Sequence, residues 1–225
     1  MSTNPVYLAL DLPRLDAAEA LAHKVKAHIG GIKLGLEFFC AHGAHGVHTL
    51  AGVGLPIFLD LKLHDIPNTV AGAARSVARF APKYLTVHAL GGADMLRAAA
   101  EALPETRITA VTILTSMDEQ ALRSIGIQDS ALEAAVRLAR LAVAAGARDI
   151  VCSPLEVKAI RAAVPSDIVL ITPGVRPPGA EVGDQKRIAT PQQAIADGAD
   201  IVVIGRPITS AADPAGAAAG IALEL

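Results

Sequence analysis

Short runs of aliphatic and β-branched residues alternate along the chain with longer segments in which apolar residues recur at helical spacing. Apolar runs of roughly 4–8 residues bounded by turn residues are typical of buried strands. The pattern predicts eight strands: Val6–Asp11, Ile32–Gly35, Ile57–Lys62, Leu85–His88, Ile108–Leu114, Asp149–Cys152, Ile168–Thr172 and Ile201–Gly205.

The segments between these runs have helix-forming composition and an apolar period near 3.6 residues. They include Asp16–His28, Thr69–Phe80, Ala93–Ala102, Ser130–Ala145, Pro154–Ala163 and Pro191–Ala196. Regular alternation of strand and helix predicts a parallel sheet, and eight such units predict a closed (β/α)8 TIM barrel. A doubly wound open sheet is the alternative, although no G-x-G-x-x-G sequence follows the first strand.

Nothing in the chain predicts a second domain. Its 225 residues suit one barrel, and no linker or block of charge divides them. The Pro- and Gly-rich stretch Thr172–Gly183 lies between the seventh strand and the next helix, so we interpret it as a functional loop. We therefore expect residues 1–225 to form a single catalytic domain.

Composition narrows the class of protein. Hydrophobic residues make up 52% of the chain and aromatic residues 3%, which favours an aliphatic core between parallel strands and covering helices. A formal charge of −2 argues against a nucleic-acid binder. The N-terminal residues do not resemble a signal peptide, no apolar run is long enough for a membrane helix, and two separated cysteines suit a reducing compartment. We expect a cytoplasmic protein.

Several ionisable residues are predicted to point into the barrel at the carboxyl ends of strands. Side chains alternate along a strand, so Phe58, Asp60 and Lys62 share the face opposite the apolar residues that meet the helices. The same alternation directs Asp11 and Lys33 inward. Barrel enzymes carry their active sites at this end. A network of Lys33, Asp60 and Lys62 satisfies the buried charges and is a plausible catalytic device, although an ion pair that only sets strand register is the alternative.

The loops after strands seven and eight predict a phosphate site. They contain Thr172–Pro177 and Gly205–Thr209, each with glycine and arginine, and Gln185 can add an amide donor. Glycine permits close backbone approach, and the forked guanidinium suits a phosphate dianion. Barrels often bind phosphate with these two loops, so their joint occurrence outweighs the reading of either as a solvated turn.

Histidine clusters predict no metal site. His42, His45 and His48 are spaced by three, but two glycines interrupt them and no carboxylate or thiol joins them, so a solvated cluster at a helix end is favoured. His64 precedes Asp65 directly, and adjacent strand-end residues point in different directions. We expect no metal ligands.

The stretch from Asp60 to Val70 resembles the signature of orotidine 5'-monophosphate decarboxylases, whose core is D-x-K-x-x-D followed by I-P-x-T. The resemblance extends in order along the chain. It includes Ala9–Asp11, Ile32–Gly35, Leu114–Ser116, Thr172–Pro177, Asp184–Gln185 and Ile204–Thr209.

This resemblance implies a set of roles. It implies that Asp11 and Lys33 contact the ribose, that Asp60 faces the substrate carboxylate, and that Lys62 is the catalytic acid. Asp65 and Thr69 serve the neighbouring subunit of a homodimer. Thr115 binds the pyrimidine, although adjacent Ser116 leaves a one-residue ambiguity. The phosphate is held by Arg176, Gln185, Gly205 and Arg206.

The implied reaction converts orotidine 5'-monophosphate to UMP and CO2 without a cofactor, the last step of UMP synthesis. Loss of CO2 leaves a carbanion at C6 that the ring delocalises poorly, so electrostatic stabilisation must dominate. Lys62 can stabilise this charge and protonate C6, while Asp60 and Asp65 hold the lysine in place.

Three other functions compete. A phosphosugar enzyme of the same superfamily shares D-x-K-x-x-D but uses Mg2+ to stabilise an enediolate. A Schiff-base aldolase requires a neutral amine on Lys62 or Lys33, whereas the flanking aspartates favour the charged form. A catalytically silent nucleotide-binding barrel needs only the phosphate loops and leaves the inward charges unexplained.

Overall fold

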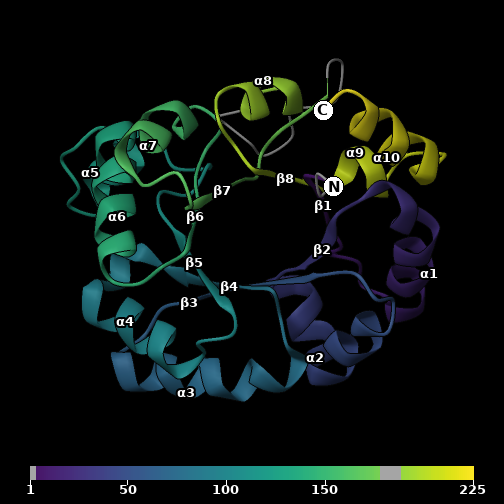
Figure 1. Ribbon diagram of the computed structural model, residues 1–225, viewed down its shortest axis with the longest axis horizontal. Coiled ribbons are helices and arrows are strands. Elements are labelled where there is room, and N and C mark those ends of the chain that lie inside the picture. Colours follow the sequence, from purple (N-terminus) through teal and green to yellow (C-terminus); the bar gives the residue numbers. More distant parts are fainter. Residues whose placement is uncertain (1–3, 178–188) are drawn as a thin grey trace.

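The computed structural model describes residues 4–177 and 189–225, and eight parallel strands close into a barrel in sequence order. The strands lie at the centre of the molecule with the helices around them (Figure 1). Their bounds are β1 Val6–Ala9, β2 Gly31–Leu34, β3 Ile57–Leu63, β4 Tyr84–His88, β5 Arg107–Val111, β6 Asp149–Val151, β7 Val169–Thr172 and β8 Ile201–Ile204. The predicted (β/α)8 barrel is confirmed, and the open sheet is excluded because β1 pairs with both β2 and β8.

All eight predicted strands are present, but several end earlier than the apolar runs do. The strand predicted as Ile108–Leu114 ends at Val111. The prediction was too long because Ile113 is buried beyond the strand end and continues the apolar pattern. The first strand ends at Ala9 rather than Asp11, although the Leu10 amide still donates to the Lys33 carbonyl at 2.9 Å. Asp11 therefore lies just beyond the rim of the barrel.

Helices surround the strands in the described part of the chain. The α-helices are α1 Leu15–Val25, α2 Leu36–Ala51, α3 Pro67–Val77, α4 Ala93–Ala102, α5 Glu119–Ser124, α6 Ala131–Ala144, α7 Val157–Ala163, α8 Pro191–Ala196, α9 Arg206–Thr209 and α10 Pro214–Leu223. Short 3-10 turns are η1 Lys26–His28, η2 Ala78–Phe80 and η3 Ala89–Gly91. The predicted helices are present with shifted ends, and α2, α5, α9 and α10 were not among them.

Local capping explains where several helices begin. Ser130 accepts the Glu133 amide at 3.2 Å while the Glu133 carboxylate accepts the Ser130 amide at 3.0 Å, a capping box that starts α6. Thr190 accepts the Gln193 amide at 3.1 Å and starts α8. Pro67 occupies the first turn of α3, where its missing amide hydrogen is harmless.

The apolar core has two shells. The larger shell lies between strands and helices, and it includes Leu8, Leu59 and Phe38. The smaller shell fills the barrel itself with Tyr7, Phe58, Tyr84, Ile171, Ile201 and Val203. Gly31 of β2 leaves room for this filling, because a Cβ there would lie 2.2 Å from the Tyr7 ring. The barrel is thus packed below its upper end by this layer of side chains.

Candidate active site

A cavity of about 670 Å³ opens above the packed layer, at the carboxyl ends of the strands. Its described lining comes from β1, β2, β3 and β5 to β8 and from the segments that follow them. Of the residues predicted from the sequence, Asp11, Lys33, Asp60, Lys62, Thr115, Arg176, Gly205 and Arg206 all line it. The structure thus brings together side chains that lie up to about 195 positions apart in the chain.

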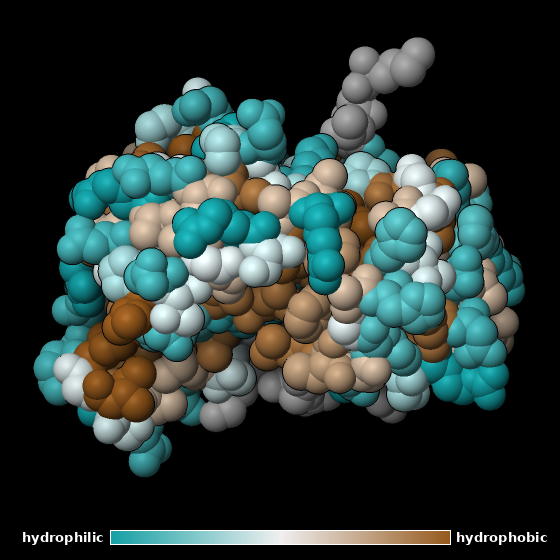
Figure 2. Space-filling model, turned by 90° about the horizontal axis from the view of Figure 1, so that it is seen from below, coloured by the Kyte–Doolittle hydropathy of each residue, from teal (hydrophilic) through white to brown (hydrophobic). Residues whose placement is uncertain are grey.

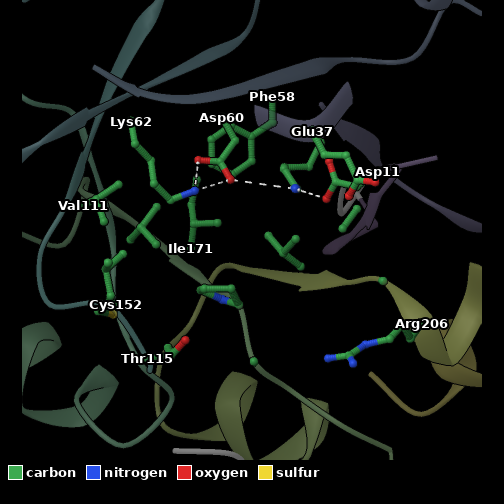
Figure 3. A pocket seen from close by; sticks show the side chains of 18 of the residues that line it. Asp11, Glu37, Phe58, Asp60, Lys62, Val111, Thr115, Cys152, Ile171 and Arg206 are labelled. Carbon is green, nitrogen blue, oxygen red and sulfur yellow. Dashed lines mark hydrogen bonds and ion pairs between the residues drawn. The ribbon is translucent and has the colours of Figure 1, made fainter. Parts of the chain in front are cut away.

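A row of alternating charges forms one wall of the cavity. Lys33 Nζ lies 2.5 Å from Asp11 Oδ2 and 3.8 Å from Asp60 Oδ2. Lys62 Nζ donates to both oxygens of Asp60, at 2.8 and 2.7 Å. Figure 3 shows this row running from Lys62 through Asp60 to Asp11. The predicted inward direction of Asp60 and Lys62, and their network with Lys33, are confirmed by these contacts.

Gly35 makes the Asp11 end of this row possible. Its amide donates to Asp11 Oδ1 at 3.0 Å, which holds the carboxylate beside Lys33. A Cβ on Gly35 would lie 2.6 Å from both Asp11 Oδ1 and Lys33 Nζ. Glycine therefore serves here for close approach of charged groups to the backbone.

The row leaves one ammonium available to a ligand. The Lys33 side chain is 10% exposed and contacts two carboxylates, whereas the Lys62 side chain is 30% exposed and lines the cavity. Asp60 joins both lysines and fixes where the Lys62 amino group lies. Such an ammonium can stabilise negative charge that develops in the cavity and can transfer a proton to it.

Cationic loops line another part of the cavity. Arg176 follows β7 and is 9% exposed, while exposed Arg206 begins α9 directly after Gly205. The Arg176 amide donates to the Ala189 carbonyl at 3.0 Å, which ties Arg176 to the residue that precedes the cap of α8. Figure 3 shows Arg206 and Thr115 across the space from Lys62 and Asp60. Guanidinium groups here suit an anionic group of a ligand.

Apolar side chains form the floor between these charged walls. Phe58, Val111, Val151, Ile171 and Val203 all belong to the lining. Thr115 is partly buried in the same lining, whereas neighbouring Ser116 is exposed and is not among the described lining residues. The floor is therefore an apolar surface suited to a flat ring, with the Thr115 hydroxyl at its edge.

Two predicted residues lie elsewhere. Asp65 and Thr69 are exposed at the start of α3 and do not belong to the described lining of the cavity. The Asp65 carboxylate accepts the Ile66 amide at 2.7 Å. Gln185 lies outside the described residues.

The histidines singled out in the sequence lie in two separate places, in α2 and beside the site. His42, His45 and His48 lie in α2. Gly43 interrupts this helix with φ 53° directly after His42, and His48 belongs to its last turn. His64 and His88 stack with ring centroids 5.6 Å apart beside β3 and β4. Burial lowers the pKa of His88, and the charges of His64 and Lys62 lower it further. Its buried Nδ1 has no hydrogen-bond partner among the described residues.

Sequence reasoning missed three residues around the site. Glu37, in the first turn of α2, and buried Cys152, after β6, belong to the lining. Thr86 of β4 lies behind Asp60 and donates to it at 3.0 Å. Strand alternation could have found Thr86, because it lies two residues after Tyr84, which fills the barrel. Glu37 carried no such signal, since the helix that holds it was not predicted.

The described ranges 4–177 and 189–225 contain neither a metal-site grouping nor a membrane-spanning helix. No three or more His, Cys, Asp or Glu side chains there are grouped as a metal site requires. Within the same ranges, no helix has the length and hydropathy needed to cross a bilayer.

The closed barrel and the charged cavity at the carboxyl ends of its strands define a (β/α)8-barrel enzyme. Residues 4–221 match the model of the orotidine 5'-phosphate decarboxylase / HUMPS family. The chain belongs to this family.

Named relatives are similar over almost the whole chain. The orotidine 5'-phosphate decarboxylase of Thermobifida fusca is 58% identical over 98% of this chain and 95% of its own. That of Novosphingobium aromaticivorans is 56% identical over 99% and 100%, respectively. The crystal structure of the Lactobacillus acidophilus orotidine 5'-phosphate decarboxylase superposes with a TM-score of 0.87 at 36% identity and covers 98% of each chain.

Proposed function

We propose that this protein decarboxylates orotidine 5'-monophosphate to UMP and CO2, the final step of UMP synthesis, without a cofactor. The observation that carries the proposal is the Lys62 ammonium, held by both oxygens of Asp60 and directed into a cavity with arginines on another side. Family membership and the names of relatives more than 55% identical agree with it.

Lys62 and Asp60 carry the bond-breaking step in this proposal. The bond between C6 and the carboxylate breaks, its electron pair stays on C6, and CO2 leaves. The Lys62 ammonium stabilises the carbanion and then transfers a proton to C6, which yields UMP. The substrate carboxylate lies beside Asp60, and its loss as neutral CO2 relieves the repulsion between two carboxylates.

Other cavity residues bind the remainder of the nucleotide. Asp11 and Lys33 contact the ribose hydroxyls, and Thr115 binds the pyrimidine edge over the apolar floor. Arg176, Gln185, Gly205 and Arg206 hold the phosphate. These contacts lie away from the bond that breaks, so their binding energy can assemble the site as well as retain the substrate.

We further propose a homodimer in which Asp65 and Thr69 reach the neighbouring subunit's site. Both are exposed. Ile66, which lies between them, is 65% exposed, and Leu90 in η3 is 39% exposed. The face over α3 carries hydrophobic side chains among hydrophilic ones (Figure 2). Exposed apolar residues of this kind mark interaction surfaces.

A subunit-mixing experiment tests this dimer. Lys62→Ala and Asp65→Ala are each expected to be inactive alone. Hybrid dimers of the two contain one site with both native residues, so mixing and refolding restores activity. If mixtures that form hybrid dimers stay inactive, Asp65 does not act across the interface.

The competing function is a magnesium-dependent phosphosugar enzyme, since the family model spans both groups of proteins. The two functions differ in substrate and in metal requirement. Absorbance of orotidine 5'-monophosphate in the ultraviolet is followed with and without EDTA. Rapid EDTA-insensitive loss of substrate supports the decarboxylase, and no turnover by folded protein favours a phosphosugar with Mg2+.

Lys62→Ala and Lys24→Ala complete this experiment. Lys24 is an exposed lysine on α1, 3.9 Å from Asp213, and does not line the cavity, so it controls for loss of a lysine as such. We expect turnover to disappear only in Lys62→Ala.

We also propose that residues 1–225 act as one catalytic domain and that the enzyme works in the cytoplasm.

A further inference from the structure

Strand β3 carries an irregularity at the residues that form the site. Leu59 pairs with Leu85 and Leu63 with Val87, so four steps along β3 match only two along β4. Lys62 lies inside this bulge with φ 48°, and it is one of two described residues other than glycine with positive φ. Bulges and left-handed non-glycine residues are strained features that gather at functional sites, where neighbouring groups must hold them.

Thr86 is the neighbouring group that faces the bulge. It lies on β4 between Leu85 and Val87, and its side chain is fully buried. Its hydroxyl oxygen accepts the Lys62 backbone amide at 2.7 Å. The same hydroxyl donates to Asp60 Oδ1 at 3.0 Å. One hydroxyl therefore replaces the interstrand hydrogen bond that the bulge removes and also contacts the central carboxylate.

The direction of both hydrogen bonds is determined by chemistry. A backbone amide can only donate, and an ionised carboxylate can only accept, so the Thr86 hydroxyl has one hydrogen-bonding arrangement here. Asp60 Oδ1, the oxygen that Thr86 contacts, also accepts from Lys62 Nζ at 2.8 Å. Thr86 is thus bonded to the backbone of Lys62 and to the side chain that orients its amino group.

We propose that Thr86 is a positioning residue that sets the place of the Lys62 ammonium by fixing both the bulge and the Asp60 carboxylate. Thr86 is not part of the described cavity lining, so it acts through these two residues rather than on the substrate. The kinetic part of this inference rests on the proposed decarboxylase function. A misplacement of about 1 Å at a reacting group lowers rates by about 10²-fold.

Thr86→Val removes the hydroxyl and keeps the shape of the side chain. We expect kcat for orotidine 5'-monophosphate to fall roughly 10- to 100-fold, while the Kd for UMP changes by less than about threefold. We expect kcat to change more than the Kd for UMP because the groups that bind ribose and phosphate remain in place. Thr86→Ser restores the hydroxyl and is expected to recover kcat to within about threefold of wild type.

Thr109→Val is the matched control. Thr109 is also a fully buried threonine, and it pairs with Thr86 across β4 and β5. Its hydroxyl contacts a different carboxylate, Asp149 Oδ2 at 3.3 Å, rather than Asp60. We expect its kcat to stay within about twofold of wild type. If Thr86→Val yields no folded protein, the experiment uses Thr86→Ala instead, which removes the same hydroxyl without added bulk.

Three kinetic results would overturn the proposal. They are a kcat within threefold of wild type in the folded hydroxyl-free variant, a Thr86→Ser variant as slow as Thr86→Val, or a UMP affinity that weakens in proportion to kcat. Wild-type protein without turnover contradicts the proposed function instead.

A crystal structure of the hydroxyl-free variant tests the positioning without activity. We expect Lys62 Nζ to lose at least one of its two contacts with Asp60, or the φ of Lys62 to leave the left-handed region. If both contacts and the bulge persist unchanged, Thr86 does not position Lys62.

Discussion

Buried ion pairs occupy both ends of the same barrel, and they differ in what surrounds them. At the lower end, where β5 and β6 begin, Arg107 Nε and Nη2 both contact Asp149 Oδ1, at 2.8 and 2.5 Å. At the upper end, Lys33 and Lys62 share Asp60 beside a cavity. Both clusters are made of inward charges from neighbouring strands, so burial of charge alone does not distinguish a catalytic site from a structural pair.

The two clusters differ in how completely their charges are satisfied. Asp149 is fully buried and accepts hydrogen bonds from Arg107 and Thr109. Tyr7 and Tyr84 pack against each other inside the barrel, with their ring centroids 5.8 Å apart. Burial raises the pKa of Asp149, and the hydrogen bonds from Arg107 oppose this rise. The lower pair has no open space beside it in the described cavity, whereas Lys62 lies against about 670 Å³ of such space. Arg107 and Lys62 are almost equally exposed, at 29% and 30%, so contact with the cavity rather than exposure distinguishes the upper cluster.

The largest expected effect breaks the upper cluster. Lys62→Ala removes both the charge that stabilises the carbanion and the proton donor, so kcat should fall at least about 10⁴-fold, or about 5.5 kcal/mol. The Tm should change by only a few degrees, because the side chain is 30% exposed. Absorbance kinetics and calorimetry measure the two quantities. A large loss of Tm with retained kcat would make Lys62 structural.

The second effect breaks the lower cluster and is expected in stability rather than in rate. Asp149→Asn leaves Arg107 without its anion, and breaking a buried pair costs about 3–5 kcal/mol. We expect roughly 3 kcal/mol, because the Arg107 side chain retains 29% exposure to solvent. At about 2–4 °C per kcal/mol, Tm falls roughly 6–12 °C. Denaturant unfolding checks this, and a kcat that falls more than threefold in folded protein contradicts it.

The third effect tests the arginine loops of the upper end. Arg206→Ala removes a charged donor from the cavity lining, and we expect kcat/KM to fall about 10²-fold, or roughly 2.7 kcal/mol. Arg97→Ala is the control, because Arg97 pairs with Asp94 on the exposed side of α4 and does not line the cavity. Steady-state kinetics at fixed ionic strength separate the two variants. Equal losses in both would remove the specific role of Arg206.

The smallest effect concerns His88, which lies beside the upper cluster. Its pKa is lowered in the folded protein, so below about pH 6.5 the unfolded chain binds more protons than the folded one. Stability present above pH 6.5 is therefore lost as pH falls, by no more than about 1.4 kcal/mol per pH unit for one group. Urea unfolding of wild type and His88→Gln between pH 7.5 and 5 measures this. The slope should be smaller in the variant, and identical slopes would contradict the prediction.

Much of the upper cluster was predictable because its signals are local. Alternation along one strand placed Asp60 and Lys62 on the same face, and the position of Asp11 and Lys33 at strand ends placed them near the same rim. Glycine and arginine in the loops after the last two strands marked the anion-binding side. Each of these inferences needs only a few consecutive residues and the geometry common to all barrels.

The lower pair and the bulge were not predictable in the same way. Arg107 and Asp149 are 42 positions apart, and either one at the start of a strand resembles an ordinary solvated charge. The bulge requires knowing how β3 registers against β4, which no residue of β3 reveals alone. The helix α2, with its three histidines and two interrupting glycines, lacked the regular pattern that would have predicted it.

The sequence by itself determined the number and order of the strands, the closed barrel and the residues that carry charge into it, because hydrophobic periodicity and strand alternation are short-range properties of the chain. Tertiary structure alone decided which charges line the cavity and which do not. It also decided that the Thr86 hydroxyl meets the Lys62 amide and the Asp60 carboxylate. Those outcomes depend on distances between strands that become neighbours only when the barrel closes.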